Sequence, residues 1–219
     1  MKRSYEPEMM DDFSIRDERI DVALNELTII NKYLGGIGTT NSALKYFIAS
    51  ENKELKILDI GSGSSDNLIA AKNNFPNLQI LSIDKNLRAL TSSKNLLKKI
   101  NSDAFNLPFK DNSCDIIHVA LFLHHFTEDQ IQKLLKEFSR IAGKGIIIND
   151  LQRSYLALSG IKILTFLFSK SNMVKNDGPL SVKRGFTKQD FLKLLSNAGV
   201  VDFVIRKKWA FRWMIVVRK

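Results

Sequence analysis

From residue 55 to residue 149, short apolar runs of strand length alternate with segments whose apolar residues recur at helical spacing. The runs that predict strands are 55–60, 79–84, 99–103, 115–121 and 145–149. Two further runs, 200–206 and 213–218, predict a closing antiparallel pair. Strands that alternate with helices across short turns are typical of a mostly parallel sheet with helices on both faces. The sequence therefore predicts an α/β fold with a seven-stranded, mostly parallel sheet and a C-terminal antiparallel strand.

Helical spacing also precedes the first strand, in segments 16–34 and 40–49. We interpret residues 1–50 as an N-terminal helical cap and residues 51–219 as the main domain. Between the strands, helices are predicted from Ser64 or Ser65 to Phe75, over 87–97, after Thr127 and after Thr187. The apolar insert 152–185 follows the fifth strand, and we expect it to form a lid over a substrate.

Composition bounds the class of protein. A chain of 219 residues fits one domain with a small cap, and 44% hydrophobic with 26% charged residues is ordinary for a globular protein. The single cysteine, Cys114, excludes an internal disulfide framework. The segment MKRSYEPEMMDD lacks the apolar core of a secretory signal, and the apolar stretch 155–168 is shorter than the ~20 residues that span a bilayer. These features predict a cytoplasmic protein.

The net charge of +10 is unevenly distributed. Residues 1–26 carry a formal charge of −4, which leaves +14 for the rest of the chain. An excess of this size is compatible with a protein that binds nucleic acid or an anionic membrane.

Ligands of such sheets bind outside the carboxyl ends of the strands, so the residues that follow each strand are the candidates for a site. The first strand is followed by Gly61-Ser62-Gly63, a turn that lets a ligand approach bare backbone at the start of a helix. A dinucleotide-binding fingerprint has a small residue three positions after Gly63, where this chain has Asp66. Carboxylates on both sides of the turn, at Asp59 and Asp66, repel a diphosphate but attract an ammonium or sulfonium group.

The next two strand ends carry acids as well. Asp84 ends the second strand, where its carboxylate can accept hydrogen bonds from both hydroxyls of a ribose. Asp103 ends the third strand, where it can accept from the exocyclic amine of adenine. This series of acids around a GxG turn predicts a nucleoside-containing cation as the ligand.

These motifs resemble the class I S-adenosylmethionine-dependent methyltransferases, which have a Rossmann-like fold. LDIGSGSSD looks like their first motif, SIDKN resembles the acidic end of their second strand, and GFTKQDFLKLLSNAGV is similar to their late helix. NSDAFNLPFKDNSCDIIHVALFLHHF is similar to a run in the small-molecule branch that includes ubiquinone and menaquinone biosynthesis methyltransferases. The resemblance covers about residues 50–219.

The resemblance implies S-adenosyl-L-methionine as cofactor, with S-adenosyl-L-homocysteine as product, and it implies roles for individual residues. The methionyl part would contact Asp59, Gly61, Ser62 and Gly63. Asp84 would hold the ribose with Lys85 beside it, Ser102, Asp103 and Ala104 would border the adenine, and Ala120 would pass beneath the sulfonium. The chain departs from the family pattern at Ser64-Ser65-Asp66, which leaves the contact to the methionine carboxylate open.

A narrower resemblance concerns the acceptor. PEMMDD, NKYLGG, NDLQRSYLALSGIKILTFLFSKS and DGPLSVKRGF look like small bacterial methyltransferases encoded beside type III polyketide synthases. This implies O-methylation of a hydrophobic phenolic or polyketide-type molecule in secondary metabolism. Carbon methylation of an aromatic or quinone-precursor ring would use the same scaffold.

Candidate catalytic residues follow the fourth strand. His124 and His125 are placed to contact an acceptor or to take its proton, and the alternative is that they cap the next helix. His118 lies inside the strand and is expected to be a packed, satisfied residue. Asn149 and Asp150, after the fifth strand, and Phe166 in the insert are candidate substrate contacts. No His, Asp and Glu cluster has metal-ligand spacing, so we predict no metal.

Two alternatives stay open at this point. A nicotinamide-dependent oxidoreductase would share the GxG turn and an acid for the ribose. A basic protein that binds nucleic acid or a membrane, with a degenerate methyltransferase fold, would explain the charge. We favour a small-molecule acceptor without nucleic acid, leave peripheral membrane contact open, and expect a monomer or a homodimer.

Overall fold

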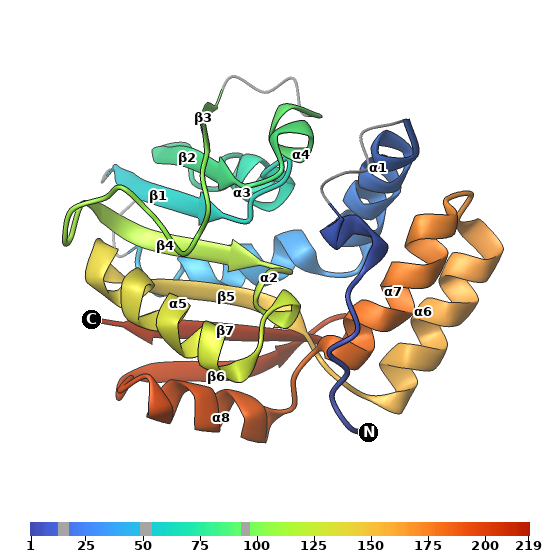
Figure 1. Cartoon of the computed structure of the whole chain (residues 1–219). Coiled ribbons are helices and arrows are strands. Elements are labelled where there is room, and N and C mark those ends of the chain that lie inside the picture. The colour runs from blue at the N-terminus through green and yellow to red at the C-terminus, as the bar shows by residue number, and fades with distance from the viewer. Residues whose placement is uncertain (13–17, 49–53, 93–96) are drawn as a thin grey trace.

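The computed structural model describes residues 1–12, 18–48, 54–92 and 97–219 (Figure 1). Its strands are β1 (Leu55–Ile60), β2 (Leu78–Asp84), β3 (Lys98–Asn101), β4 (Cys114–Ala120), β5 (Ala142–Leu151), β6 (Phe203–Lys208) and β7 (Arg212–Arg218). Its helices are α1 (Glu18–Tyr33), α2 (Gly36–Leu44), α3 (Asp66–Ala71), α4 (Leu87–Ser92), α5 (Glu128–Ile141), α6 (Tyr155–Phe168), α7 (Asn172–Arg184) and α8 (Lys188–Asn197).

The strands form one seven-stranded sheet in the order β3-β2-β1-β4-β5-β7-β6. Strands β1 to β5 run parallel to one another, and β7 runs antiparallel to both of its neighbours, β5 and β6. The predicted mostly parallel sheet with one antiparallel C-terminal strand is confirmed. The chain order reverses between β1 and β4, so the carboxyl ends of these two strands are the expected place for a ligand.

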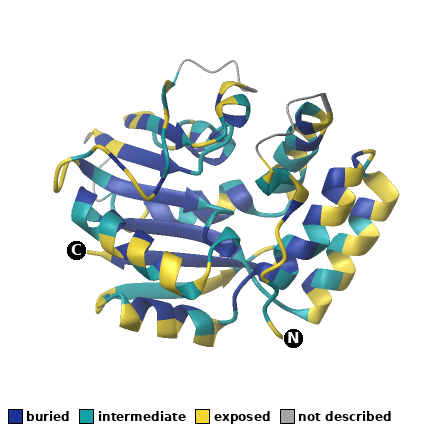
Figure 2. Ribbon diagram, in the orientation of Figure 1, coloured by how far each residue is buried: buried dark blue, intermediate teal, exposed yellow. Residues whose placement is uncertain are grey.

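Alternate residues of the inner strands enter two separate cores, because successive side chains of a strand point to opposite faces. Ile57 and Ile116 pack with residues of α2 and α3 on one face of the sheet. Leu58 and Ile117 pack with α5 and α8 on the other face. Both faces of the sheet are therefore covered, and its inner strands are mostly buried, whereas the edge strands β3 and β6 are half-buried or exposed (Figure 2).

A third group of helices lies beyond the carboxyl ends of the parallel strands (Figure 1). Ile20 and Ala23 of α1 pack against Met173 and Val174 of α7 in a small core of their own. Helices α6 and α7 form an antiparallel pair where a single apolar lid segment was expected. Helix α6 has 14 residues, and no helix in the described part of the chain is long and apolar enough to cross a bilayer.

Several element bounds differ from the sequence prediction. Helix α2 begins at Gly36 instead of residue 40, because Gly35 adopts a left-handed conformation (φ 77°) that turns the chain directly into it. Helix α3 ends at Ala71, four residues before the predicted end. Residues 16, 17, 49 and 93–96 of the predicted helices lie outside the described residues, as does the predicted domain boundary after residue 50.

Strand β5 is twice as long as predicted, and this changes the position of two candidate residues. It runs from Ala142 to Leu151 and pairs with β7 through Leu151 and Arg212. Asn149 and Asp150 therefore lie inside a strand that is hydrogen-bonded on both sides, not in a loop after it. Pairing with β7 continues through Asn149, Asp150 and Leu151. The apolar run ends before these residues, so the sequence pattern predicted too short a strand.

Candidate active site

A cavity of about 940 Å³ lies at the carboxyl ends of β1, β2 and β4. Residues after these strands form one wall, and residues of α1, α6 and α7 form the other. Its volume is at the upper end of the range for small-molecule sites, so it has room for a cofactor and an acceptor together. The second wall is mainly apolar, with Leu24, Leu27, Ile161, Leu164 and Val174 among its residues.

The GxG turn forms part of the first wall and uses both glycines. Gly61 has a φ of 64°, and a Cβ there would lie 2.0 Å from a ring carbon of Phe122. Gly63 has a φ of 48°, and no atom lies within 4 Å of the position of its missing Cβ. Gly61 is thus required for packing, whereas Gly63 leaves an open space on the cavity wall that a ligand can fill.

Replacing Gly61 by alanine is expected to destabilise the fold by about 2–4 kcal/mol, since it adds left-handed strain to an overlap with Phe122. Gly38→Ala is the matched control, because nothing lies within 4 Å of its Cβ position and it sits inside α2. Chemical denaturation of the two variants measures the difference. Equal stability of Gly61→Ala and the parent chain would contradict the tight packing of this turn.

Asp84 links the turn to the end of β2. Its Oδ2 accepts a hydrogen bond from the Gly63 N–H at 2.8 Å, and its Oδ1 accepts from the Asn86 N–H at 2.8 Å. Burial raises the pKa of this carboxyl, although both backbone donors lower it. An ionised carboxylate offers about four lone-pair sites, so each oxygen keeps one for a hydroxyl in the cavity.

The end of β3 supplies a second, more open acid. Asp103 Oδ2 accepts from Lys85 Nζ at 2.8 Å and Oδ1 accepts from the Phe105 N–H at 3.0 Å. The ammonium group of Lys85 holds the pKa of Asp103 below its usual value. Ser102, Asp103, Ala104 and Lys85 all line the cavity near the turn, where the sequence placed an adenine.

Two further residues of the turn face the cavity. Asp66 accepts hydrogen bonds from Ser64 at 2.5 Å and from Thr28 of α1 at 2.6 Å, which ties the cap to the turn. The Ser62 hydroxyl is buried and has no hydrogen-bond partner within the described residues. A buried polar atom without a partner is costly, so a ligand that bonds Ser62 would be favoured. Ala120 at the end of β4 also lines this wall.

Asp59 needs a correction, because it does not lie on the cavity wall. It is 3% exposed, and its Oδ1 lies 2.7 Å from Nδ1 of His118. His118 Nε2 lies 3.0 Å from the Thr40 hydroxyl, so this histidine is packed and satisfied as predicted. Asp59 therefore joins β1 to β4 and α2 instead of facing a ligand.

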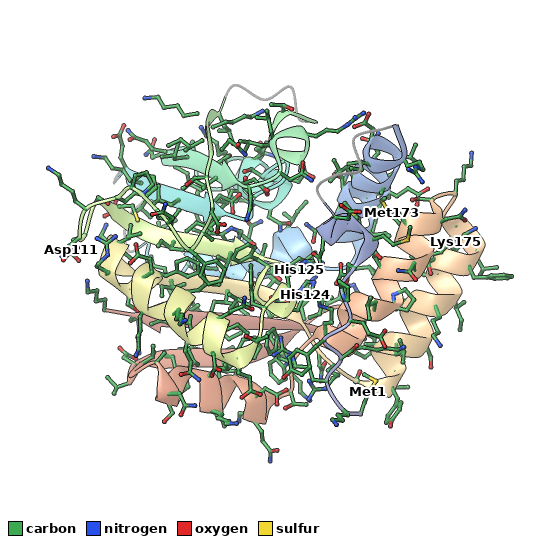
Figure 3. The ribbon with its side chains drawn as sticks, viewed as in Figure 1. Met1, Asp111, His124, His125, Met173 and Lys175 are labelled. Atoms are coloured by element: carbon green, nitrogen blue, oxygen red, sulfur yellow. The ribbon has the colours of Figure 1, made fainter. Side chains whose placement is uncertain are left out.

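His124 and His125 lie in a single 3-10 turn after β4 and both line the cavity (Figure 3). Nδ1 of His124 lies 2.7 Å from Asp150, and Nδ1 of His125 lies 2.7 Å from Asp11. Burial raises the pKa of each of these two carboxyls, but its histidine partner outweighs burial and the net pKa is lowered. Ionised carboxylates only accept hydrogen bonds, so Nδ1 donates in both pairs, and in a neutral imidazole Nε2 is then the nitrogen that accepts.

The N-terminal segment carries active-site residues that the sequence did not reveal. Asp11 orients His125, and Glu8 Oε1 lies 3.6 Å from Nε2 of His124. Arg184 of α7 holds this segment in place, since its Nη1 donates to Asp11 at 2.8 Å and its Nε donates to the His124 carbonyl at 3.1 Å. The signal in the sequence was two acids, Glu8 and Asp11, that flank the apolar pair MM in a segment treated only as acidic.

The prediction that no metal-ligand cluster exists also needs correction. Glu8, His124 and His125 bring ligand atoms within 4.8 Å of one another. A carboxylate that accepts a hydrogen bond from Nδ1 orients the imidazole equally well for binding a metal ion or for accepting a proton at Nε2. Charge separates the two uses: Asp11 pairs with Arg184, and Asp150 lies in the field of the buried Arg212, whose pKa burial lowers to about 10. Because guanidiniums already balance these acids, a divalent cation would add uncompensated positive charge.

The three candidate substrate contacts lie elsewhere than predicted. Asn149 is fully buried and donates to the Gly36 carbonyl at 2.9 Å, so it fastens α2 to β5. Asp150 is 1% exposed, and its carboxylate is hydrogen-bonded to His124 instead of facing a ligand. Phe166 is 78% exposed and points away from the cavity, because the inner face of α6 carries Ile161 and Leu164.

Known proteins match part of this chain in sequence and most of it in fold. Residues 58–149, from β1 to the end region of β5, match the family model of a methyltransferase domain. This part of the chain is similar to the methyltransferase domains of that family. A curated relative of it is the demethylmenaquinone methyltransferase of Thermotoga maritima, 32% identical over 117 residues, which make up 51% of this chain and 50% of the relative. The chain thus spans about half the length of that relative.

Solved structures show that the fold of the methyltransferase domain extends to the rest of the chain. The plantazolicin methyltransferase BpumL, solved with a triazolic desmethylPZN analog and SAH, has a TM-score of 0.72 at 16% identity, covering 94% of this chain and 92% of that one. A SAM-dependent methyltransferase from Aquifex aeolicus has a TM-score of 0.64 at 16% identity and covers 90% and 97%. At these identities the likeness concerns the fold alone.

Proposed function

We propose that the chain transfers the methyl group of S-adenosyl-L-methionine to a hydroxyl oxygen of a hydrophobic phenolic small molecule. The observation that carries this proposal is that one cavity holds both the Gly61–Gly63 turn with Asp84 and the oriented imidazole of His125. A nucleoside cation and an acceptor hydroxyl would therefore lie within the same enclosed space.

Four features of the first wall fit the cofactor. The open space beside Gly63 accommodates a ligand against the backbone, and the buried Ser62 hydroxyl needs a partner. Asp84 keeps free lone pairs for two ribose hydroxyls, and Asp103 keeps an exposed carboxylate for an amine. When bound, S-adenosylmethionine supplies an electrophilic methyl group on a sulfonium with a good leaving group.

The chain's own residues act mainly by positioning the acceptor and by accepting its proton. The apolar second wall excludes water and holds an aromatic acceptor close to the cofactor. His125 is more open than the 3%-exposed His124, so its Nε2 is the proton acceptor in this proposal. The phenolic proton moves to Nε2 of His125 while Asp11 accepts the hydrogen bond from Nδ1 and stabilises the imidazolium.

Calorimetry with S-adenosylhomocysteine tests the cofactor half of the proposal, and a parallel fluorescence titration with NADH tests the oxidoreductase alternative. We expect micromolar binding of S-adenosylhomocysteine and none of NADH. Binding of NADH in place of S-adenosylhomocysteine would overturn the proposal. Incubation with a panel of phenols and mass spectrometry of the products then tests the acceptor, and a product methylated on ring carbon would reassign the methylated atom.

Metal removal separates a proton acceptor from a metal site. Dialysis of the enzyme against EDTA is expected to leave its methylation rate unchanged, since arginines already balance the acids around His124 and His125. The rate is measured before dialysis, after it, and after addition of Mg²⁺, Mn²⁺ or Zn²⁺. A rate lost on dialysis and restored by one of these ions would show that the cluster of Glu8, His124 and His125 holds a metal.

A further inference from the structure

Helix α6 is apolar on two opposite faces, and only one of them is covered. Its inner face lines the cavity through Ala157, Gly160, Ile161 and Leu164. Its outer apolar face, which we define by the residues with the largest exposure, is open to solvent (Figure 2). This face consists of Tyr155 (70% exposed), Leu156 (74%), Ile163 (61%), Phe166 (78%), Leu167 (62%) and Phe168 (77%).

A helix with apolar residues on opposite faces normally lies in a protein core or in a bilayer. Helix α6 is too exposed for a protein core and too short to span a bilayer. Its 14 residues are about 21 Å long, whereas a bilayer core is about 30 Å thick. Large exposed apolar patches rimmed by polar residues mark interaction sites. The length and the exposure of α6 therefore fit a helix that lies along an interface with one face inserted.

Within α6, α7 and their connection the exposed charges have one sign, and Glu26 of α1 accepts hydrogen bonds from the backbone of that connection. Residues 155–184, all of them described, contain four lysines and one arginine, and their single acid is Asp177. Asp177 is 3% exposed and accepts hydrogen bonds from the backbone N–H groups of Met9 and Met10, so it adds no surface charge. The surface cations of this stretch are Lys162, Lys170, Lys175 and Lys183, whereas Arg184 is 4% exposed and pairs with Asp11.

A shallow groove between α6 and α7 brings cationic and apolar groups together. It is lined by Phe166 together with Lys162, Lys175 and Lys183, and Glu6 of the N-terminal segment is the one carboxylate on its wall. Three ammonium groups beside an aromatic ring provide contacts for the phosphates of lipid headgroups next to the acyl boundary.

We propose that the outer apolar face of α6 docks the protein onto an anionic lipid surface. Its aromatic and aliphatic side chains enter the headgroup region, and the lysines of α6 and α7 bind lipid phosphates. A second copy of the chain fits this face less well, because a two-fold contact would set lysines of one copy against lysines of the other.

Docking in this way has a consequence for the acceptor, which rests on the proposed function. The same helix would contact lipid with one face and the acceptor cavity with the other. A helix is about 10 Å in diameter, so the cavity would lie within one helix diameter of the membrane. The class of acceptor that this arrangement favours is a phenol with an apolar tail that partitions into lipid.

Co-sedimentation with vesicles tests the docking without any use of activity. Vesicles of phosphatidylcholine with phosphatidylglycerol are compared with vesicles of phosphatidylcholine alone, at low and at physiological salt. We expect retention by the anionic vesicles only, and about a tenfold loss of retention in Phe166→Ser/Phe168→Ser and in Lys162→Glu/Lys170→Glu. Val201→Ser is the matched control, since Val201 is an exposed apolar residue (92%) outside this face.

Three results would overturn the docking proposal. The parent chain would fail to sediment with anionic vesicles, or Val201→Ser would lose as much retention as the α6 variants. Alternatively, light scattering would show a dimer that Phe166→Ser/Phe168→Ser converts to monomers, which would assign the face to a second copy. Calorimetry with S-adenosylhomocysteine on the same samples reports folding and the cofactor site separately, so failure of the proposed function is recognised independently.

Discussion

Replacing His125 by alanine is expected to lower kcat by about 10²- to 10⁴-fold, the usual contribution of a positioned general base. The imidazole removes the acceptor's proton in our proposal, and Asp11 orients the ring through the hydrogen bond to Nδ1. Affinity for S-adenosylhomocysteine should stay nearly the same, because in our proposal His125 contacts the acceptor and not the cofactor. Rates of methyl transfer at saturating substrates and calorimetry on the same preparation measure both quantities.

Two comparisons make the His125 result specific. Asp11→Asn keeps the shape of the side chain but removes its charge, so kcat should fall by less than in His125→Ala. The acid limb of the pH–rate profile should be present in the parent chain and absent in His125→Ala, which a purely structural role would not produce. An unchanged kcat in His125→Ala would assign deprotonation of the acceptor to another group.

Replacing Asp84 by alanine is expected to weaken binding of S-adenosylhomocysteine about 100-fold or more, since two hydrogen bonds to a charged acceptor are lost. The half-buried carboxylate also holds the N–H groups of Gly63 and Asn86, so the turn that faces the cofactor loses its anchor. Calorimetry measures the affinity, and a thermal melt of each variant reports any loss of fold.

Asp103→Ala serves as the graded control for Asp84→Ala. Asp103 is more exposed and already neutralised by Lys85, so its loss should weaken binding by about tenfold or less. Equal affinities of the Asp84→Ala variant and the parent chain, with both variants folded, would show that the cofactor does not use the end of β2. A larger effect at Asp103 than at Asp84 would reverse the proposed orientation of ribose and adenine.

The sheet, and the gathering of the residues proposed for the cofactor on one cavity wall, could be predicted because their signals are local. Each parallel strand is a short apolar run, and the residue that matters follows it directly, as Asp84 follows Ile83. Parallel strands present their carboxyl ends at one edge, so residues far apart in the chain were expected to meet there. Gly61 and Gly63 are also visible locally, because a turn of this kind requires left-handed backbone.

The acceptor side could not be predicted, because its contacts join distant parts of the chain. Nothing near Asp11 in the sequence indicates His125, 114 residues away, yet the two side chains form a hydrogen bond. Asp150 was placed in a loop because the apolar run stops before it, whereas pairing with β7 keeps it inside β5. Phe166 was placed inside the cavity because a helix that is apolar all round gives no indication of which face turns inward.

The hydrogen bond between Asp11 and His125 joins two parts of the chain at one site: the N-terminal segment and the matched domain. The residues that we propose for the cofactor follow the strands of the matched domain, whereas the proposed acceptor wall comes from α1, α6, α7 and the N-terminal segment. Changes in these outer segments can alter the accepted molecule without disturbing cofactor binding. Diversification of acceptor choice in related enzymes should therefore be concentrated before β1 and between β5 and α8, and comparison of such sequences will show whether it is.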